Sequence, residues 1–267
     1  MTAMAIRGVG VCAGGMRDWA GASAVLRGAT AFLPGPAEKR PVEGLPQTEQ
    51  RRINETSRLA CLAAADAVAL LARDAAATLP AVFASSDGDG AVLMQMLNAL
   101  AQRDVVLSPT AFHNSVYNAP AGYWSIATRA SAPSTTLCAD AASLAVALLE
   151  GQAQARESGG PVLVVAVDAP FPDAIRVLGA SAAPFACALV LEDAVCDPSL
   201  PRIEGWTIVE HAGSGEVEDA PDALGGAFAG NAAAVALPLL RALARRQPTR
   251  VALPYLDGTS LLLDVAP

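Results

Sequence analysis

The sequence predicts an α/β fold in which helices are layered against a central sheet. Segments of β-type and helical character alternate along the chain, which is typical of layered α/β domains. The run "GPVLVVAVDAP" at 160–170 is apolar without alternation, as in a strand that is buried on both faces. Because 53% of the 267 residues are hydrophobic, the chain can bury a large core, and we expect one domain over residues 1–267.

The elements of the first part follow from composition and periodicity. The apolar segment 4–12 predicts a buried strand, and helix formers dominate 19–26. Proline, glycine and charge make 28–50 a surface loop, whereas the Ala- and Leu-rich segment 54–76 has helical spacing. We then expect, in order, a strand at 80–86, a turn at 87–90, a helix at 91–102, a loop at 107–118, a helix at 119–128 and a strand at 132–139.

The second part continues the alternation. Residues 140–154 are almost continuously apolar and predict a helix that is buried on most sides. Asp257-Gly258 suits a type I′ turn between two final strands. The other expected elements are strands at 160–170, 186–193 and 202–210 and a helix at 233–245.

Charge and cysteine content restrict the classes of partner. A formal charge of −8 disfavours a nucleic acid, whose phosphates would be repelled. The five cysteines are scattered without a C-x-x-C pair, which predicts a reduced chain with no disulfide framework and no metal site. We recognise neither a signal peptide nor an apolar run of about 20 residues that could span a membrane. We therefore expect a cytoplasmic protein without a cofactor.

Residues Gly8 to Ala13 fit the pattern G-x-G-x-x-A, which is typical of a dinucleotide-binding turn. That motif needs an acidic residue at the tip of a second strand about 20 residues later. Here that region is helical and then rich in proline. We therefore favour a tight strand-to-loop turn.

A dense group of polar residues surrounds His113 in "FHNSVYN". Such groups are costly to bury unless they are mutually satisfied, so a structural network beneath a loop and the lining of a pocket or interface both stay open. The other histidine, His211, is expected to face solvent. Met94 and Met96, with their leucine neighbours, suit either a core or a surface that accommodates an apolar chain.

The stretch "TLCADAASL" at 136–144 predicts a strand end, a tight turn and a helix start, with Asp140 at the apex. A carboxylate at that place accepts main-chain N–H bonds and meets the positive end of the helix dipole, together worth about 1 kcal/mol. We therefore expect Asp140 to be an N-cap. The same position lowers the pKa of a thiol, so a fold that uses a nucleophilic cysteine would place it there.

The order of these motifs resembles the N-terminal half of the β-ketoacyl-ACP synthases. The resemblance covers roughly residues 4–193, and "FHNSVYNAPAGYWSI" looks like the chain-length factors of bacterial aryl-polyene, type II polyketide-like pathways. It implies a thiolase-like α-β-α fold. Its first half would be complete at 1–199, and its second half would be reduced at 200–267 to a helix and a terminal β-hairpin.

The family's elbow, T-A-C-S-S-S-L, aligns on 138–144 and puts Asp140 where the acyl-accepting cysteine belongs. A carboxylate is a poor nucleophile, and its acyl adduct would be a labile anhydride. Cys138 is two residues too early and is expected within the strand. His211 lacks the motif of the family's paired histidines. The resemblance therefore implies that the chain does not condense acyl groups by itself.

The leading hypothesis is a non-catalytic chain-length factor that pairs with an active ketosynthase subunit and reaches the acyl carrier protein through it. In the implied fold, one strand joins the sheets of the two subunits. Its residues are Ser134, Thr135, Thr136, Leu137 and Cys138. The residues expected to face the acyl tunnel or the partner are Leu93, Met94, Met96, Leu97, Phe112, His113, Asn114 and Asn118.

Two alternatives stay open. The chain could be a stand-alone acyl-thioester decarboxylase or hydrolase that uses Asp140 or His113 as an acid or base. It could also be a homodimeric scaffold without an acyl tunnel.

Overall fold

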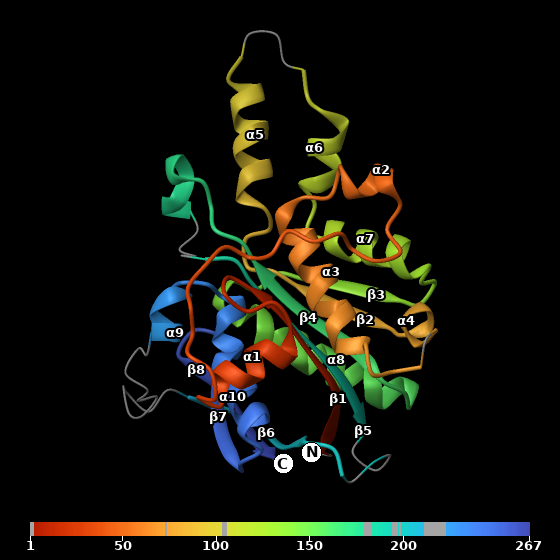
Figure 1. Ribbon diagram of the computed structural model, residues 1–267, viewed down its shortest axis with the longest axis vertical. Coiled ribbons are helices and arrows are strands. Elements are labelled where there is room, and N and C mark those ends of the chain that lie inside the picture. Colours follow the sequence, from red (N-terminus) through yellow and green to blue (C-terminus); the bar gives the residue numbers. More distant parts are fainter. Residues whose placement is uncertain are drawn as a thin grey trace.

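The computed structural model describes residues 3–72, 74–102, 106–178, 183–193, 197, 199–210 and 223–267. Within these ranges the strands form one eight-stranded sheet in the order β3-β2-β4-β5-β1-β6-β8-β7 (Figure 1). β2 is parallel to both β3 and β4, and the other neighbouring pairs are antiparallel. The strands are β1 (Met4–Ala13), β2 (Ala81–Ala84), β3 (Ser134–Leu137), β4 (Val162–Asp168), β5 (Phe185–Asp193), β6 (Arg202–Glu210), β7 (Thr249–Pro254) and β8 (Thr259–Ala266).

Helices connect most of these strands. The α-helices are α1 (Trp19–Leu26), α2 (Gln47–Gln50), α3 (Glu55–Val68), α4 (Ala75–Thr78), α5 (Gly90–Leu100), α6 (Pro109–Asn114), α7 (Ala119–Thr128), α8 (Ser143–Ser158), α9 (Ala223–Ala227) and α10 (Leu237–Arg245). The 3₁₀ turns are η1 (Asp140–Ala142), η2 (Asp173–Leu178) and η3 (Ala233–Ala236).

Helices cover both faces of the sheet, as the sequence predicts for a layered α/β fold. Alternate residues of β4 point to opposite faces. Val165 belongs to a core with α3 and α7, whereas Val164 belongs to a second core with α1, α8 and α10. β4 is buried along its whole length, which explains its unbroken apolar run.

The expected helices are confirmed with some differences at their ends. α3 begins after Asn54, whose side chain accepts a main-chain N–H of the first turn, but it ends at Val68, earlier than its periodicity predicts. α7 has the expected bounds. The segment 107–118 was expected to be a loop, yet Ser108 caps a short helix, α6, within it. A side-chain cap followed by proline is a local start signal that explains this helix.

The terminal hairpin is confirmed, but its expected type I′ turn is wrong. Such a turn requires a positive φ at both central residues. In the pair Asp257-Gly258 only the glycine has one, with a φ of 73°. The last main-chain bond of the hairpin before the turn joins the N–H of Tyr255 to the carbonyl of Thr259 (3.2 Å), so the connection is longer than two residues.

Gly8 and Gly10 lie inside β1, so the expectation of a strand-to-loop turn at these positions is wrong. A Cβ atom on Gly8 would lie 1.9 Å from the carbonyl oxygen of Ala67 on α3. Glycine is needed here because the main chain of α3 packs directly on the strand. Both glycines are paired with β5, so they form no strand-to-helix turn that could hold a pyrophosphate.

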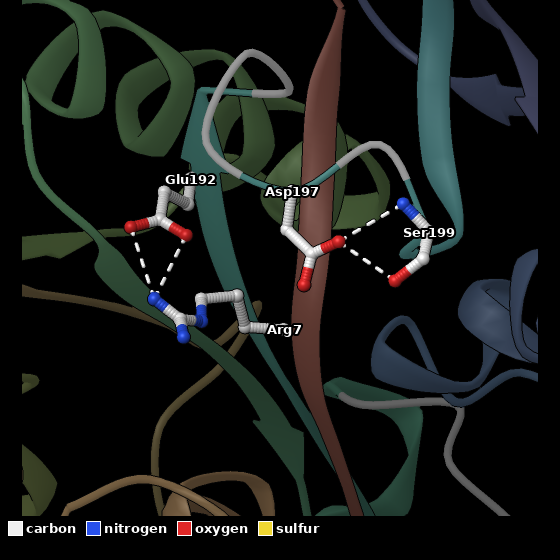
Figure 2. A network of polar contacts seen from close by, with 4 residues as sticks. All are labelled: Arg7, Glu192, Asp197 and Ser199. Carbon is white, nitrogen blue, oxygen red and sulfur yellow. Dashed lines mark hydrogen bonds and ion pairs between the residues drawn. The ribbon is translucent and has the colours of Figure 1, made fainter.

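A polar network supports the β1–β5 pair at the end of the sheet away from the site described below (Figure 2). Arg7 lies at a register shift in β1, and its Nη1 is 3.2 and 3.0 Å from the two carboxylate oxygens of buried Glu192 on β5. Nearby, Asp197 accepts bonds from the hydroxyl (2.7 Å) and N–H (3.0 Å) of Ser199. These bonds, helped by the charge of Arg7, hold the pKa of Asp197 below its usual value.

Candidate functional site

Three parallel strands end at one edge of the sheet and bring polar residues together there. Ser85 and Ser86 follow β2, Cys138 follows β3, and Asp168 is the last residue of β4. The carboxyl ends of parallel strands are where α/β proteins usually place binding and catalytic groups. We therefore take this edge as the candidate site.

Asp168 is the buried centre of this cluster, with 4% of its surface exposed. Its Oδ1 accepts bonds from the hydroxyl of Ser85 (2.9 Å) and from the N–H (2.9 Å) and hydroxyl (3.0 Å) of Ser86. Burial raises the pKa of Asp168 to about 6, although the donated hydrogen bonds act in the opposite direction. The main-chain carbonyl of Asp168 accepts a further bond from the amide of Asn231 (3.0 Å).

The chain turns sharply after β3, with Asp140 at the apex. Asp140 has a φ of 50°, in the left-handed region that non-glycine residues seldom adopt, and it is exposed. A strained turn between a strand and a helix is the geometry of a nucleophile elbow, which presents one side chain at the top of the sheet. The local fold is therefore suited to display the side chain at position 140.

The expected N-cap role of Asp140 is wrong, because Asp140 is the first residue of η1 and the N-cap is Ala139. Ser143 closes the turn instead. Its hydroxyl accepts the Ala139 N–H (3.0 Å) and donates to the carbonyl of Asp140 (2.7 Å). Cys138 lies just past the last residue of β3, which corrects the expectation that it lies within the strand.

The thiol of Cys138 connects the buried cluster to the surface. It donates to the carbonyl of Ser86 over 3.0 Å, and the residue is exposed. The hydroxyl of Tyr117 interacts with Cys138, and this interaction is the largest of the causes that raise the pKa of Tyr117. The sequence predicts that the loop around 110–118, which contains Tyr117, reaches the partner, and 46% of the surface of Tyr117 is exposed here.

β3 is the edge strand next to this site. The carbonyls of Pro133 and Leu137 accept the N–H groups of Ala81 on β2 and of Ser85, which follows β2. Because alternate residues of a strand direct their main-chain groups to opposite sides, Ser134 and Thr136 direct theirs to the outer edge. An edge strand offers unpaired N–H and C=O groups to another chain.

α5 and α6 form an arm that projects from the body of the subunit (Figure 1). On α5 only Gly90 and Val92 are buried. Leu93, Leu97 and Phe112 are 37%, 42% and 60% exposed. Met94 and Met96 are partly buried. The arm therefore carries apolar side chains that the described part of this chain does not cover.

The base of the arm is anchored firmly. The carboxylate of Asp89 accepts the N–H of Val92 (2.9 Å) as the N-cap of α5 and the hydroxyl of Thr56 on α3 (3.0 Å). Gly90 packs against the ring of Phe171, which a Cβ atom would meet at 2.3 Å. The direction of α5 is thus set by contacts at its first turn.

The polar group around His113 divides between two environments. His113 and Asn118 are exposed, and the His113 ring meets the ring of Tyr123 edge-on at 5.7 Å. Asn114 is buried. Its amide donates to the carbonyl of Arg52 (2.7 Å) and accepts from the Tyr123 hydroxyl (2.9 Å). Asn114 therefore belongs to a satisfied structural network, which corrects the expectation that it faces a tunnel or a partner.

Several expected features are not assembled in the described residues. There, no hydrogen bond joins Asp140 to His113, and no group of three or more His, Cys, Asp or Glu side chains could hold a metal ion. His211 lies outside the described residues. Among the helices that the structure describes, none has the length and hydrophobicity needed to cross a bilayer.

Sequence reasoning missed the Ser85–Ser86–Asp168 cluster. The available signal was a lone carboxylate at the end of the otherwise apolar run 162–168. A charged residue that ends a strand predicted to be buried on both faces needs partners, because an unpaired buried charge is strongly unfavourable.

Comparison with known proteins places this geometry in a family. Residues 19–220 match the β-ketoacyl synthase N-terminal domain, and the chain belongs to that family. No curated protein matches the chain.

Solved structures show the same fold. A chain in the complex of the ketosynthase ApeO with its chain length factor ApeC from Xenorhabdus doucetiae is 22% identical, with a TM-score of 0.69 and 99% of each chain covered. The ishigamide ketosynthase/chain length factor is 13% identical, with a TM-score of 0.73 and again 99% of each chain covered. The type II polyketide ketosynthase AntDE in complex with the acyl-carrier protein AntF is 12% identical, with a TM-score of 0.72 and the same coverage. The thiolase-like fold that the sequence predicts is confirmed.

Proposed function

We propose that this chain is a chain-length factor that pairs with an active ketosynthase and shapes the space for the growing acyl chain without carrying an acyl group itself. One observation carries the proposal. The elbow keeps its strained strand-to-helix turn, with a φ of 50° at the apex, but displays the carboxylate of Asp140. A carboxylate in that place forms no stable thioester-like intermediate.

The edge strand and the arm support the need for a partner. β3 offers main-chain groups at Ser134 and Thr136 for an added strand. The nearby arm exposes Leu93, Leu97 and Phe112, and clustered apolar residues of this kind mark interaction surfaces. The same subunit thus combines a strand for pairing with apolar residues that a second subunit would cover.

The identity of the partner is proposed from the descriptions of the similar structures. Two of them are ketosynthase and chain length factor assemblies, and one contains an acyl-carrier protein. A net charge of −8 disfavours direct binding of an acidic carrier protein, so we assign the carrier to the ketosynthase subunit. We also propose a single domain over 1–267, since β6, β7 and β8 extend the sheet of the first half.

The test compares the isolated chain with its mixture with a ketosynthase of the same pathway. Condensation is expected only in the mixture, together with a co-eluting species that has the combined mass of the two subunits. Intact-mass measurement during turnover should find acyl groups on the ketosynthase alone. Condensation by the isolated chain, or an acyl adduct on it, overturns the proposal.

Asp140→Ala separates this proposal from the alternatives. Asp140 is exposed and is not the N-cap of η1, so the variant should keep the ability of the mixture to condense. A stand-alone decarboxylase or hydrolase would instead show turnover by the isolated chain that Asp140→Ala or His113→Ala abolishes. Self-association without any co-elution of a ketosynthase would favour the homodimeric scaffold.

A further inference from the structure

The carboxylate of Asp168 lies at the inner end of a hydrogen-bond chain that reaches the exposed elbow. It holds both Ser85 and Ser86 by their hydroxyl groups, at 2.9 and 3.0 Å. The carbonyl of Ser86 accepts a bond from the thiol of Cys138 (3.0 Å), and Cys138 in turn interacts with the hydroxyl of Tyr117. A group buried at the end of β4 is thereby connected to two exposed residues.

Ser86 makes this chain sensitive to the charge of Asp168. Its Oγ lies 3.0 Å from Oδ1 of Asp168 and 2.9 Å from Oδ2 of Asp87, yet a hydroxyl donates only one proton. Ionised Asp168 competes for that proton because a charged acceptor binds it more strongly than a neutral one. When Asp168 is protonated, Asp87 becomes the stronger acceptor.

Other titratable groups around Asp168 do not neutralise it. Those that interact with it are Asp87 after β2, Tyr117 after α6 and Cys187 on β5, and all three are acids. Burial raises the pKa of Asp168 to about 6, so the group is ionised in a buried place at neutral pH. Strongly perturbed carboxyl groups of this kind are common at functional sites.

We propose that Asp168 is a positioning residue whose carboxylate fixes Ser86 and, through Ser86, holds the elbow at Cys138 and the side chain of Tyr117 in the arrangement that meets the partner subunit. The inference rests on the proposed function for the identity of that partner. The positioning itself concerns this chain alone and is measurable without a partner.

The experiment follows the reactivity of the Cys138 thiol with a disulfide reagent such as DTNB. Cys12, Cys61 and Cys187 are buried, and Cys196→Ser as the background removes the remaining cysteine, which lies outside the described residues. Asp168→Asn should label about fivefold faster than the background protein at pH 7.5, because the neutral amide holds Ser86 more weakly. The ratio of the two rates should approach one below pH 5, because Asp168 of the background protein is then protonated and, like asparagine, uncharged.

Asp66→Asn is the matched control. Asp66 is also a carboxyl whose pKa burial raises, and it accepts the N–H groups of Val11 (3.1 Å) and Trp19 (2.6 Å). It lies outside the cluster around Ser86, so its variant should label Cys138 at the background rate at every pH. Ser86→Ala removes the shared hydroxyl but keeps the N–H bond, and we expect an intermediate rate. It tests the chain even if Asp168→Asn does not fold.

Partner binding distinguishes positioning from a general structural role. Asp168→Asn should weaken ketosynthase binding about fivefold at pH 7.5 while its urea midpoint is not lowered. A merely structural role would lower both. Equal labelling of Asp168→Asn, Ser86→Ala and the background, or unchanged affinity despite faster labelling, overturns the inference. If the background protein binds no ketosynthase, the proposed function fails, and the labelling rates still decide whether Asp168 positions the elbow.

Discussion

A Cβ atom on Gly10 would lie 2.0 Å from the main-chain carbonyl oxygen of Ala63. This relationship brings the backbone of α3 into direct contact with β1 in the middle of the sheet. α3 shares its core with the neighbouring strand β5, and Thr56 of α3 also holds Asp89 at the base of the arm, so both depend on this packing. The glycines of the first strand are therefore required for packing.

Gly10→Ala should lower the free energy of unfolding by about 3 kcal/mol, since the added methyl group meets main-chain atoms that cannot rotate away. Urea unfolding of the isolated chain measures this change. Gly122→Ala is the control, because nothing lies within 4 Å of its added Cβ atom and alanine favours α7 by about 0.5–1 kcal/mol. Equal effects of the two substitutions would contradict the close packing of α3 on β1.

Asp168 should impose a pH dependence on stability. Its pKa rises from 3.8 to about 6 on folding, so the stabilisation from this group is full below pH 3.8 and is lost as the pH rises through 6. This loss lowers the free energy of unfolding by about 3 kcal/mol. Asp168→Asn lacks this titration, so its free energy of unfolding relative to wild type should rise by about that amount between pH 4 and pH 7.

Urea unfolding at several pH values measures the difference. Asp173→Asn, at an exposed carboxylate, serves as the control and should show no comparable change. A difference between Asp168→Asn and wild type that stays constant with pH would rule out the raised pKa.

Thr136→Pro should weaken the complex with the ketosynthase about tenfold or more. Proline removes an N–H group that β3 directs to its outer edge, while the bonds of Pro133 and Leu137 with β2 remain. Thr136→Val keeps the N–H group and the β-branched shape and should bind like wild type. Binding titrations of both variants measure the effect. Equal affinities would exclude strand pairing at this edge.

Met96→Trp should shorten the product of the mixed complex. Met96 is partly buried on the arm, and a larger side chain there would reduce the space for an acyl chain. Leu70→Trp is the control at a side chain that is 90% exposed beyond the end of α3, and it should leave the product unchanged. Product masses from the two mixtures measure the difference. Equal products would remove Met96 from the tunnel.

Local patterns in the sequence were sufficient for much of the fold. The bounds of α1 and α7 follow from helix-forming residues and spacing, and the burial of β4 follows from its apolar run. These features depend on residues that are close together in the chain, so they can be read from the sequence alone. The resemblance placed Asp140 at the turn that the structure gives a φ of 50°.

Only the tertiary structure decided how the site is assembled. Ser85 and Asp168 are 83 residues apart and meet because β2 and β4 are parallel neighbours. The same is true of Asn114, whose partners Arg52 and Tyr123 lie on other elements. The sequence by itself determined the strands and the longer helices, although it missed α6, whereas the pairing of strands determined which polar groups meet, because such contacts depend on register and not on local composition.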